Sequence, residues 1–121
     1  MYQIRVEDTF AAAHFITDYH GKCERLHGHN YRVRVWAEGT VLGTGGMLLD
    51  FGLLKKALRE VLGVLDHNNL NDIPEFDHGN PSAELIAEYI YQRIIELLPG
   101  APVMRVEVFE TEKNMAAFQP E

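Results

Sequence analysis

The spacing of hydrophobic and polar residues divides the chain into strands and helices. Apolar and polar positions alternate from Tyr2 to Phe10, from His29 to Glu38 and from Val103 to Thr111, which is typical of half-buried β-strands. The first stretch continues through Phe15, and Met115 to Phe118 is predicted to form a short last strand. The pattern therefore predicts two strands near the start of the chain and two near its end.

Two helices are predicted between these pairs of strands. Apolar residues recur at helical spacing from Phe51 to Leu65, and Asp50 stands at the N-cap position. The second helix follows Asn80-Pro81-Ser82 and ends at Pro99-Gly100. Its inward side is expected to hold Leu85, Ile86, Tyr89, Ile90, Ile94, Leu97 and Leu98. The order of elements predicts a single α+β domain over residues 1–121, with a four-stranded antiparallel sheet and both helices on one face.

The edges of such a sheet would expose unpaired backbone groups. A four-stranded sheet has two edge strands, and edges of this kind are normally paired or protected. Apart from its arginines, the second strand carries few residues that would discourage pairing with another chain. We therefore expect the protein to oligomerise through its sheet edges.

Composition and charge exclude several classes of protein. The chain has 121 residues, of which 46% are hydrophobic and 24% charged, as in ordinary folded domains. Eleven basic and eighteen acidic residues give a net charge of -7, which argues against a non-specific nucleic-acid surface or an anionic-membrane patch. No apolar run approaches the roughly 20 residues of a membrane span. The single cysteine excludes an intrachain disulfide, so we expect a cytoplasmic protein. From the charge and the absence of long apolar runs, we expect no nucleic-acid or membrane partner.

Three histidines form a candidate metal site. If a strand begins near His27, its period of two sends His27 and His29 to the same face, and His14 stands on the preceding strand. Three neutral ligands around Zn²⁺ leave a fourth position open, which suits catalysis better than a closed structural site. Taken alone, His14 would more commonly be a core residue and the His-x-His pair a surface feature. His20 and His78 lie in polar stretches and are expected at the surface.

The single cysteine, Cys23, lies in a polar segment near these histidines and is flanked by Lys22 and Arg25. A lone cysteine is usually a small buried hydrophobe. Positive neighbours and a nearby metal would instead favour the thiolate. Such a thiolate could act as nucleophile, metal ligand or general base, and the spacing does not choose among these roles.

Three acidic positions are further candidates. Asp66 and His67 follow the first predicted helix and could form part of a proton relay or only a polar turn. Glu110 falls on the same alternating face as apolar residues of the third strand, where a carboxylate needs hydrogen-bonding partners. A ligand with two convergent N–H groups, such as an amino-pyrimidinone ring, would satisfy it, although a position at the sheet rim in water would do so too. Glu84 is most simply a favourable charge at a helix N-terminus.

Six motifs occur in order along the chain. They are Phe10-x-Ala-Ala-His14, Cys23-x-x-x-His27-Gly-His29, Asp50-Phe51-Gly-x-Leu-Lys55, Leu65-Asp66-His67-Asn-x-Leu-Asn71, Pro81-Ser82-x-Glu84 and Val108-x-Glu110-Thr111. Together they resemble the 6-pyruvoyl-tetrahydropterin synthase / 6-carboxy-tetrahydropterin synthase family over nearly the whole chain. The resemblance implies the tunnelling fold, in which the sheets of three subunits join into a twelve-stranded barrel and two trimers stack as a homohexamer.

The same resemblance implies roles for the candidate residues. The zinc ligands would be His14, His27 and His29. Cys23 would be the base that abstracts a proton, and Asp66 and His67 would complete the proton relay from a neighbouring subunit.

The resemblance also implies where the substrate lies. Glu110 would anchor a pterin ring through its N–H groups, with Glu84 and Ser82 nearby. Ala83 stands where family members often have threonine, so no hydroxyl contact is expected from that position. Lys22 and Arg25 are candidates for contacting a triphosphate group.

The gap between Cys23 and His27 separates branches of the family. The three intervening residues, Glu24-Arg25-Leu26, resemble the bacterial 6-carboxy-tetrahydropterin synthases of the queuosine (7-deazaguanine) pathway. The implied reaction converts 7,8-dihydroneopterin triphosphate to 6-carboxy-5,6,7,8-tetrahydropterin and releases acetaldehyde and triphosphate. One alternative is elimination of triphosphate to give 6-pyruvoyl-tetrahydropterin, and one from another class is a non-catalytic module that binds metal or pterin.

Overall fold

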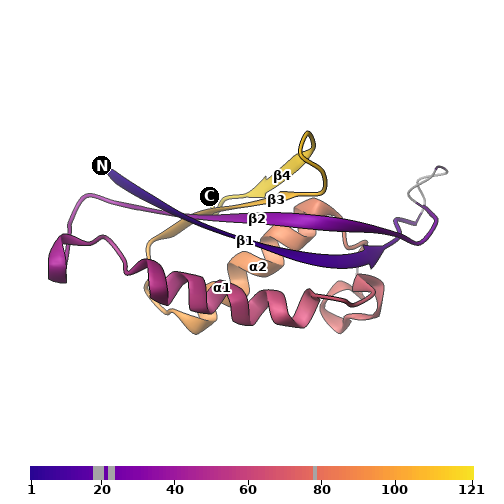
Figure 1. Cartoon of the computed structure of the whole chain (residues 1–121), viewed down its shortest axis with the longest axis horizontal. Helices are drawn as coiled ribbons and strands as arrows, with labels where there is room; N and C mark the ends of the chain where they lie inside the picture. The colour runs from indigo at the N-terminus through magenta and orange to yellow at the C-terminus, as the bar shows by residue number, and fades with distance from the viewer. Residues whose placement is uncertain (18–20, 22–23, 78) are drawn as a thin grey trace.

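A single antiparallel sheet with two helices on one face makes up the fold (Figure 1). The computed structural model describes residues 1–17, 21, 24–77 and 79–121. The strands are β1 (Tyr2–His14), β2 (His27–Gly39), β3 (Val103–Phe109) and β4 (Met115–Phe118), in the order β1-β2-β3-β4. The helices are α1 (Phe51–Leu65) and α2 (Ala83–Leu97). The prediction of an α+β fold with two strands, two helices and two strands is confirmed.

Both helices begin where the sequence predicts. The Asp50 carboxylate accepts a hydrogen bond from the Gly52 backbone N–H, and the Ser82 hydroxyl accepts one from Leu85. The prediction that Leu85 and Leu97 point inward is wrong, since they are 38% and 40% exposed. The buried stripe of α2 follows the helical repeat through Ile86, Ile90 and Ile94, and Leu85 and Leu97 lie at its flanks.

The core lies between the helices and one face of the sheet. Strand register places Val6 opposite Val35, and Val33 opposite Val108, all on the helix-facing side. Phe10 stacks on its cross-strand neighbour Tyr31 with ring centroids 4.6 Å apart. The helices fill this side with fully buried leucines and isoleucines, namely Leu54, Leu58, Leu65, Ile86, Ile90 and Ile94.

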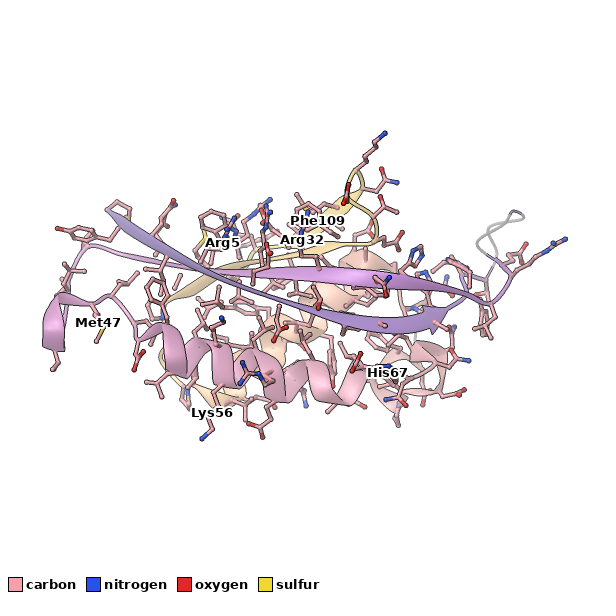
Figure 2. All side chains as sticks on the ribbon, in the orientation of Figure 1. Arg5, Arg32, Met47, Lys56, His67 and Phe109 are labelled. Atoms are coloured by element: carbon pink, nitrogen blue, oxygen red, sulfur yellow. The ribbon has the colours of Figure 1, made fainter. Side chains whose placement is uncertain are left out.

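Within the described part of the chain, the two helices leave the opposite face of the sheet uncovered (Figure 1). Arg32 and Arg34 lie over the Phe109 ring, with guanidinium carbons 4.4 and 4.9 Å from its centroid. Arg34 also donates to the Glu7 carboxylate at 2.7 Å, which lowers the pKa of Glu7. Figure 2 shows Arg5, Arg32 and Phe109 together on this face, away from the helices.

Among the described residues, backbone and side-chain hydrogen bonds cover the free edge of β1 near its C-terminal end. The Ala11 N–H donates to the Asp66 carboxylate at 2.9 Å, and the Ala11 carbonyl accepts from the His67 N–H at 2.6 Å. The Ala13 N–H donates to the Asn68 carbonyl at 3.0 Å. Oligomerisation through the remaining edges stays a prediction. None of the helices among the described residues has the length and hydropathy needed to span a membrane.

Candidate metal centre and substrate site

The three predicted metal ligands meet at one end of the sheet. The β1–β2 register pairs His14 with His27 and Ala12 with His29, so all three imidazoles lie on the helix-facing side. Their ring centroids are 4.6 to 5.1 Å apart. One ligand nitrogen from each ring can be chosen so that all three lie within 4.8 Å of one another. The geometry predicted from the His-x-His spacing is therefore present.

Backbone carbonyls orient two of the rings. The Nδ1–H of His14 donates to the Pro81 carbonyl at 2.8 Å, and the Nδ1–H of His27 donates to the Arg25 carbonyl at 2.7 Å. A carbonyl only accepts, so in each neutral ring the proton is on Nδ1 and the Nε2 lone pair is free. Metal-binding histidines usually have this kind of partner on their other nitrogen.

The third ring carries a buried nitrogen that has no hydrogen-bond partner among the described residues. The Nε2 of His29 is buried, and no described residue forms a hydrogen bond with it. Burial is the main cause of the lowered pKa of His14 and His29, and the nearby Glu110 carboxylate opposes that shift. Both rings are therefore favoured in the neutral form that binds metal. Three neutral nitrogen ligands fit a catalytic Zn²⁺ site with an open position.

Glu110 lies beside the three histidines. Its carboxylate oxygens are 3.8 Å from the Nε2 of His14 and 4.0 Å from the Nε2 of His29, and its side chain is 29% exposed. Its backbone N–H donates to the Asn114 carbonyl at 3.1 Å, which holds the turn between β3 and β4. Glu110 therefore belongs to the histidine cluster rather than to a distant rim.

A small cavity adjoins this carboxylate. It has a volume of about 180 Å³ and is lined by Ala83, Glu84, Glu110, Asn114, Met115 and Ala116. The predicted neighbours Glu84 and Glu110 thus share one cavity at the start of α2. The hydroxyl of Ser82 caps α2 by accepting from Leu85 at 3.2 Å.

Asp66 and His67 form a separate pair at the edge of β1. The Nδ1 of His67 is 2.9 Å from the Asp66 carboxylate, and the side chain of His67 is 82% exposed. Hydrogen bonds from Ala11 and then His67 lower the pKa of Asp66. The sequence left open whether these two adjacent side chains touch each other, and the structure shows that they do. Within the described ranges, no hydrogen bond, ion pair or ring contact joins this pair to the three histidines.

The backbone of His67 has a conformation that favours glycine. Its φ is 59°, which is uncommon outside glycine and costs on the order of 1 kcal/mol. The hydrogen bonds of Asp66 and His67 to Ala11 stabilise this turn against that cost. Figure 2 shows His67 just beyond the end of α1, pointing away from the core.

Some predicted residues lie outside the described part of the chain. They are the proposed base Cys23 and the neighbouring or surface candidates His20, Lys22 and His78. Arg25 is described and exposed, and its carbonyl contacts His27.

The sequence reasoning missed the carbonyls of Pro81 and Arg25. Any residue has a backbone carbonyl, so nothing in the residue types identifies these two. It also missed Tyr31, whose fully buried hydroxyl has no hydrogen-bond partner among the described residues. The place of Tyr31 two residues after His29 on the same strand face was the available signal.

Comparisons of sequence and of structure with known proteins all find tetrahydropterin synthases and their relatives. The sequence model of the family described as 6-pyruvoyl tetrahydropterin synthase matches residues 3–121. The 6-carboxy-5,6,7,8-tetrahydropterin synthase of Synechocystis is 38% identical over 124 residues, covering 98% of this chain and 93% of that protein. Human 6-pyruvoyl tetrahydrobiopterin synthase is 35% identical over 105 residues, covering 84% and 72%. The structure of Caenorhabditis elegans 6-pyruvoyl tetrahydropterin synthase superposes with a TM-score of 0.91 at 29% identity, covering 99% of this chain and 96% of that one.

Proposed function

Because the chain belongs to the 6-pyruvoyl tetrahydropterin synthase family, whose members are lyase-type enzymes, we propose that it is a zinc-dependent 6-carboxy-5,6,7,8-tetrahydropterin synthase. The substrates are 7,8-dihydroneopterin triphosphate and one water molecule, and the products are 6-carboxy-5,6,7,8-tetrahydropterin, acetaldehyde and triphosphate. The enzyme acts in the cytoplasm, in the queuosine (7-deazaguanine) pathway.

The convergence of three histidine side chains is the main support for this proposal. Three imidazoles converge at the end of the sheet, and backbone carbonyls hold the protons of His14 and His27 on Nδ1. The buried Nε2 of His29 has no protein partner in the described structure. A zinc ion held by these rings supplies Lewis acidity toward the hydroxyl groups of the substrate side chain.

The other residues bind the ring and move protons. Glu110 accepts hydrogen bonds from the pterin N–H groups, and the cavity it shares with Glu84 takes that end of the substrate. Cys23, four residues before His27, removes a proton from the side chain. Asp66 holds the proton of His67 on Nδ1, so that Nε2 can exchange a proton with the substrate.

In this proposal, Asp66 and His67 form part of the active site of a neighbouring subunit. The ring of His67 is 82% exposed at the sheet edge, and among the described residues it has no hydrogen bond, ion pair or ring contact with His14, His27 or His29. A homohexamer that joins sheet edges would bring this ring to a second copy's metal centre. The uncovered part of the β1 edge is consistent with such pairing.

The choice of product rests on the short gap between Cys23 and His27. Relatives named for the 6-carboxy and for the 6-pyruvoyl product are similarly identical, at 38% and 35%. The three-residue gap favours the 6-carboxy branch.

The test combines metal analysis with product analysis. Purified protein is expected to contain zinc and to release acetaldehyde from 7,8-dihydroneopterin triphosphate, and Cys23→Ala is expected to lose turnover. Formation of 6-pyruvoyl-tetrahydropterin without acetaldehyde would support the elimination reaction instead. Zinc and pterin binding with no turnover would support the non-catalytic module.

A further inference from the structure

The side chain of Asn80 binds one residue at three points. Its Oδ1 accepts from the backbone N–H of Thr17 at 3.0 Å and from the Thr17 hydroxyl at 2.9 Å. Its Nδ2 donates to the Thr17 carbonyl at 3.2 Å. A single amide thus pairs with both backbone groups of Thr17, as a neighbouring strand would do.

The residue after Asn80 contacts a metal ligand. The Pro81 carbonyl accepts from the Nδ1–H of His14 at 2.8 Å, and His14 is 1% exposed. The proline ring fixes φ of Pro81 and restricts the backbone of Asn80 before it. The Ser82 N–H also donates to the Asn80 carbonyl at 2.8 Å. Little freedom therefore remains between the Asn80 side chain and the Pro81 carbonyl.

These contacts form a closed ring of residues. Asn80 forms hydrogen bonds with Thr17, and Pro81 forms one with His14. Two adjacent residues therefore bind the end of β1 and the segment that follows it. We propose that Asn80 is a positioning residue for the metal centre. By binding Thr17 it fixes where the Pro81 carbonyl stands, and that carbonyl keeps the proton of His14 on Nδ1 and its Nε2 free. The inference rests on the proposed function only in taking the three histidines as the metal site.

The chain offers a matched control in Asn71. Its Oδ1 accepts from the Phe15 N–H at 2.9 Å, and its Nδ2 donates to the Phe15 carbonyl at 3.0 Å. This amide therefore holds the same segment in the same way. Its neighbours Leu70 and Asp72 form no hydrogen bond with the three histidines in the described ranges. Asn71→Ala removes a comparable clamp and leaves the carbonyl of Pro81 in place.

The first experiment measures zinc affinity by competition with a chelating dye. Asn80→Ala is expected to weaken zinc binding by about 10-fold, the low end of the loss seen when a partner behind a metal ligand is disturbed, and Asn71→Ala by less than about threefold. Urea unfolding of both metal-free variants reports the purely structural loss. Equal weakening in the two variants, or wild-type affinity in Asn80→Ala, would overturn the proposal.

The second experiment reads the ring of His14 without metal. Nitrogen-15 spectra of histidine-labelled, metal-free protein are expected to show His14 with its proton on Nδ1 in the wild type and in Asn71→Ala. Asn80→Ala is expected to lose that preference, and its retention would overturn the proposal. If the wild type binds no zinc, the metal centre of the proposed function fails, but this spectrum still decides the role of Asn80.

A milder variant covers the case in which Asn80→Ala does not fold. Asn80→Asp keeps both bonds accepted from Thr17 and replaces the donated bond by a repulsion between two oxygens. It is expected to weaken zinc binding less than tenfold and to broaden the His14 signal. Wild-type behaviour in both measurements would overturn the proposal.

Discussion

The helix-facing side of the sheet has an apolar middle and a polar end, although continuous strands run through both. In its middle, Val6 lies opposite Val35 and Val33 lies opposite Val108, all at most 4% exposed. At its end, β1 and β2 place His14 opposite His27. The middle is an apolar core, and the end is a cluster of three imidazoles that could hold a metal ion.

The two regions differ in whether the chain satisfies its own atoms. The buried apolar side chains in the middle belong to one hydrophobic cluster with residues of α1 and α2, and they have no polar atoms to satisfy. At the end, the Nε2 of His29 and the hydroxyl of Tyr31 are buried without a hydrogen-bond partner among the described residues. Buried polar atoms of this kind are rare in folded proteins and call for an explanation. The core region therefore serves as a rigid support, and the polar end is the part of this face where the proposed metal and substrate would bind.

Removing one imidazole is expected to have the largest effect. His29→Ala should abolish zinc binding and lower turnover by several orders of magnitude, because two ligands hold the ion poorly. The metal-free variant should differ from the wild type by no more than about 1 kcal/mol, since loss of the ring contacts is offset by removing a buried unpaired nitrogen. Metal analysis, the acetaldehyde assay and urea unfolding measure these effects. Full zinc content in the variant would contradict the assignment of His29.

A substitution in the core region should lower stability without weakening zinc binding. Val33→Ala removes two buried methyl groups and is expected to lower the free energy of unfolding by about 2 kcal/mol. Zinc affinity and turnover of the folded variant should stay close to those of the wild type, because the histidine register is unchanged. Urea unfolding and the dye competition assay test this. A large loss of zinc affinity at unchanged secondary structure would mean that the two regions are not separable.

The sequence predicted the core region more completely than the site. Alternation and helical spacing depend on local residue types, so the strands, the helices and the shared face of His27 and His29 could be predicted. The exposure of Leu85 and Leu97 could not, since the width of the buried stripe depends on what packs against α2. The helical repeat alone does not fix that width.

The contacts that orient the histidines could not be predicted from the sequence. The carbonyls of Pro81 and Arg25 carry no residue signature, and the bonds of Asn80 to Thr17 link positions 63 residues apart. The sequence indicated Asp66 and His67 as candidates but not their direct contact, and the attachment of Asp66 to Ala11 depends on the β1 edge. Residue types thus indicated the ligands, and only the tertiary structure showed what orients them.

The two regions should also respond differently to pH in the metal-free protein. Burial lowers the pKa of His14 and His29, so below the unfolded value of about 6.5 the unfolded chain binds more protons than the folded one. Stability is therefore expected to fall as the pH drops from 7.5 to 5.5. Urea unfolding at both values should show a smaller fall in His14→Asn and the wild-type fall in Val33→Ala. An equal pH dependence in all three proteins would contradict the neutral, buried state of His14.

The smallest effect is expected at the boundary between the regions. Tyr31 stacks on Phe10 on the core side, and its ring centroid is 5.3 Å from that of His29 on the site side. Burial, together with the Glu110 charge, raises the pKa of Tyr31, and the hydroxyl has no partner among the described residues. Tyr31→Phe should therefore change the free energy of unfolding of the metal-free protein by less than about 1 kcal/mol, in the stabilising direction. A destabilisation well above 1 kcal/mol in urea unfolding would mean that an ordered water satisfies the hydroxyl. In that case the unsatisfied region ends at His29 and Tyr31 belongs to the core.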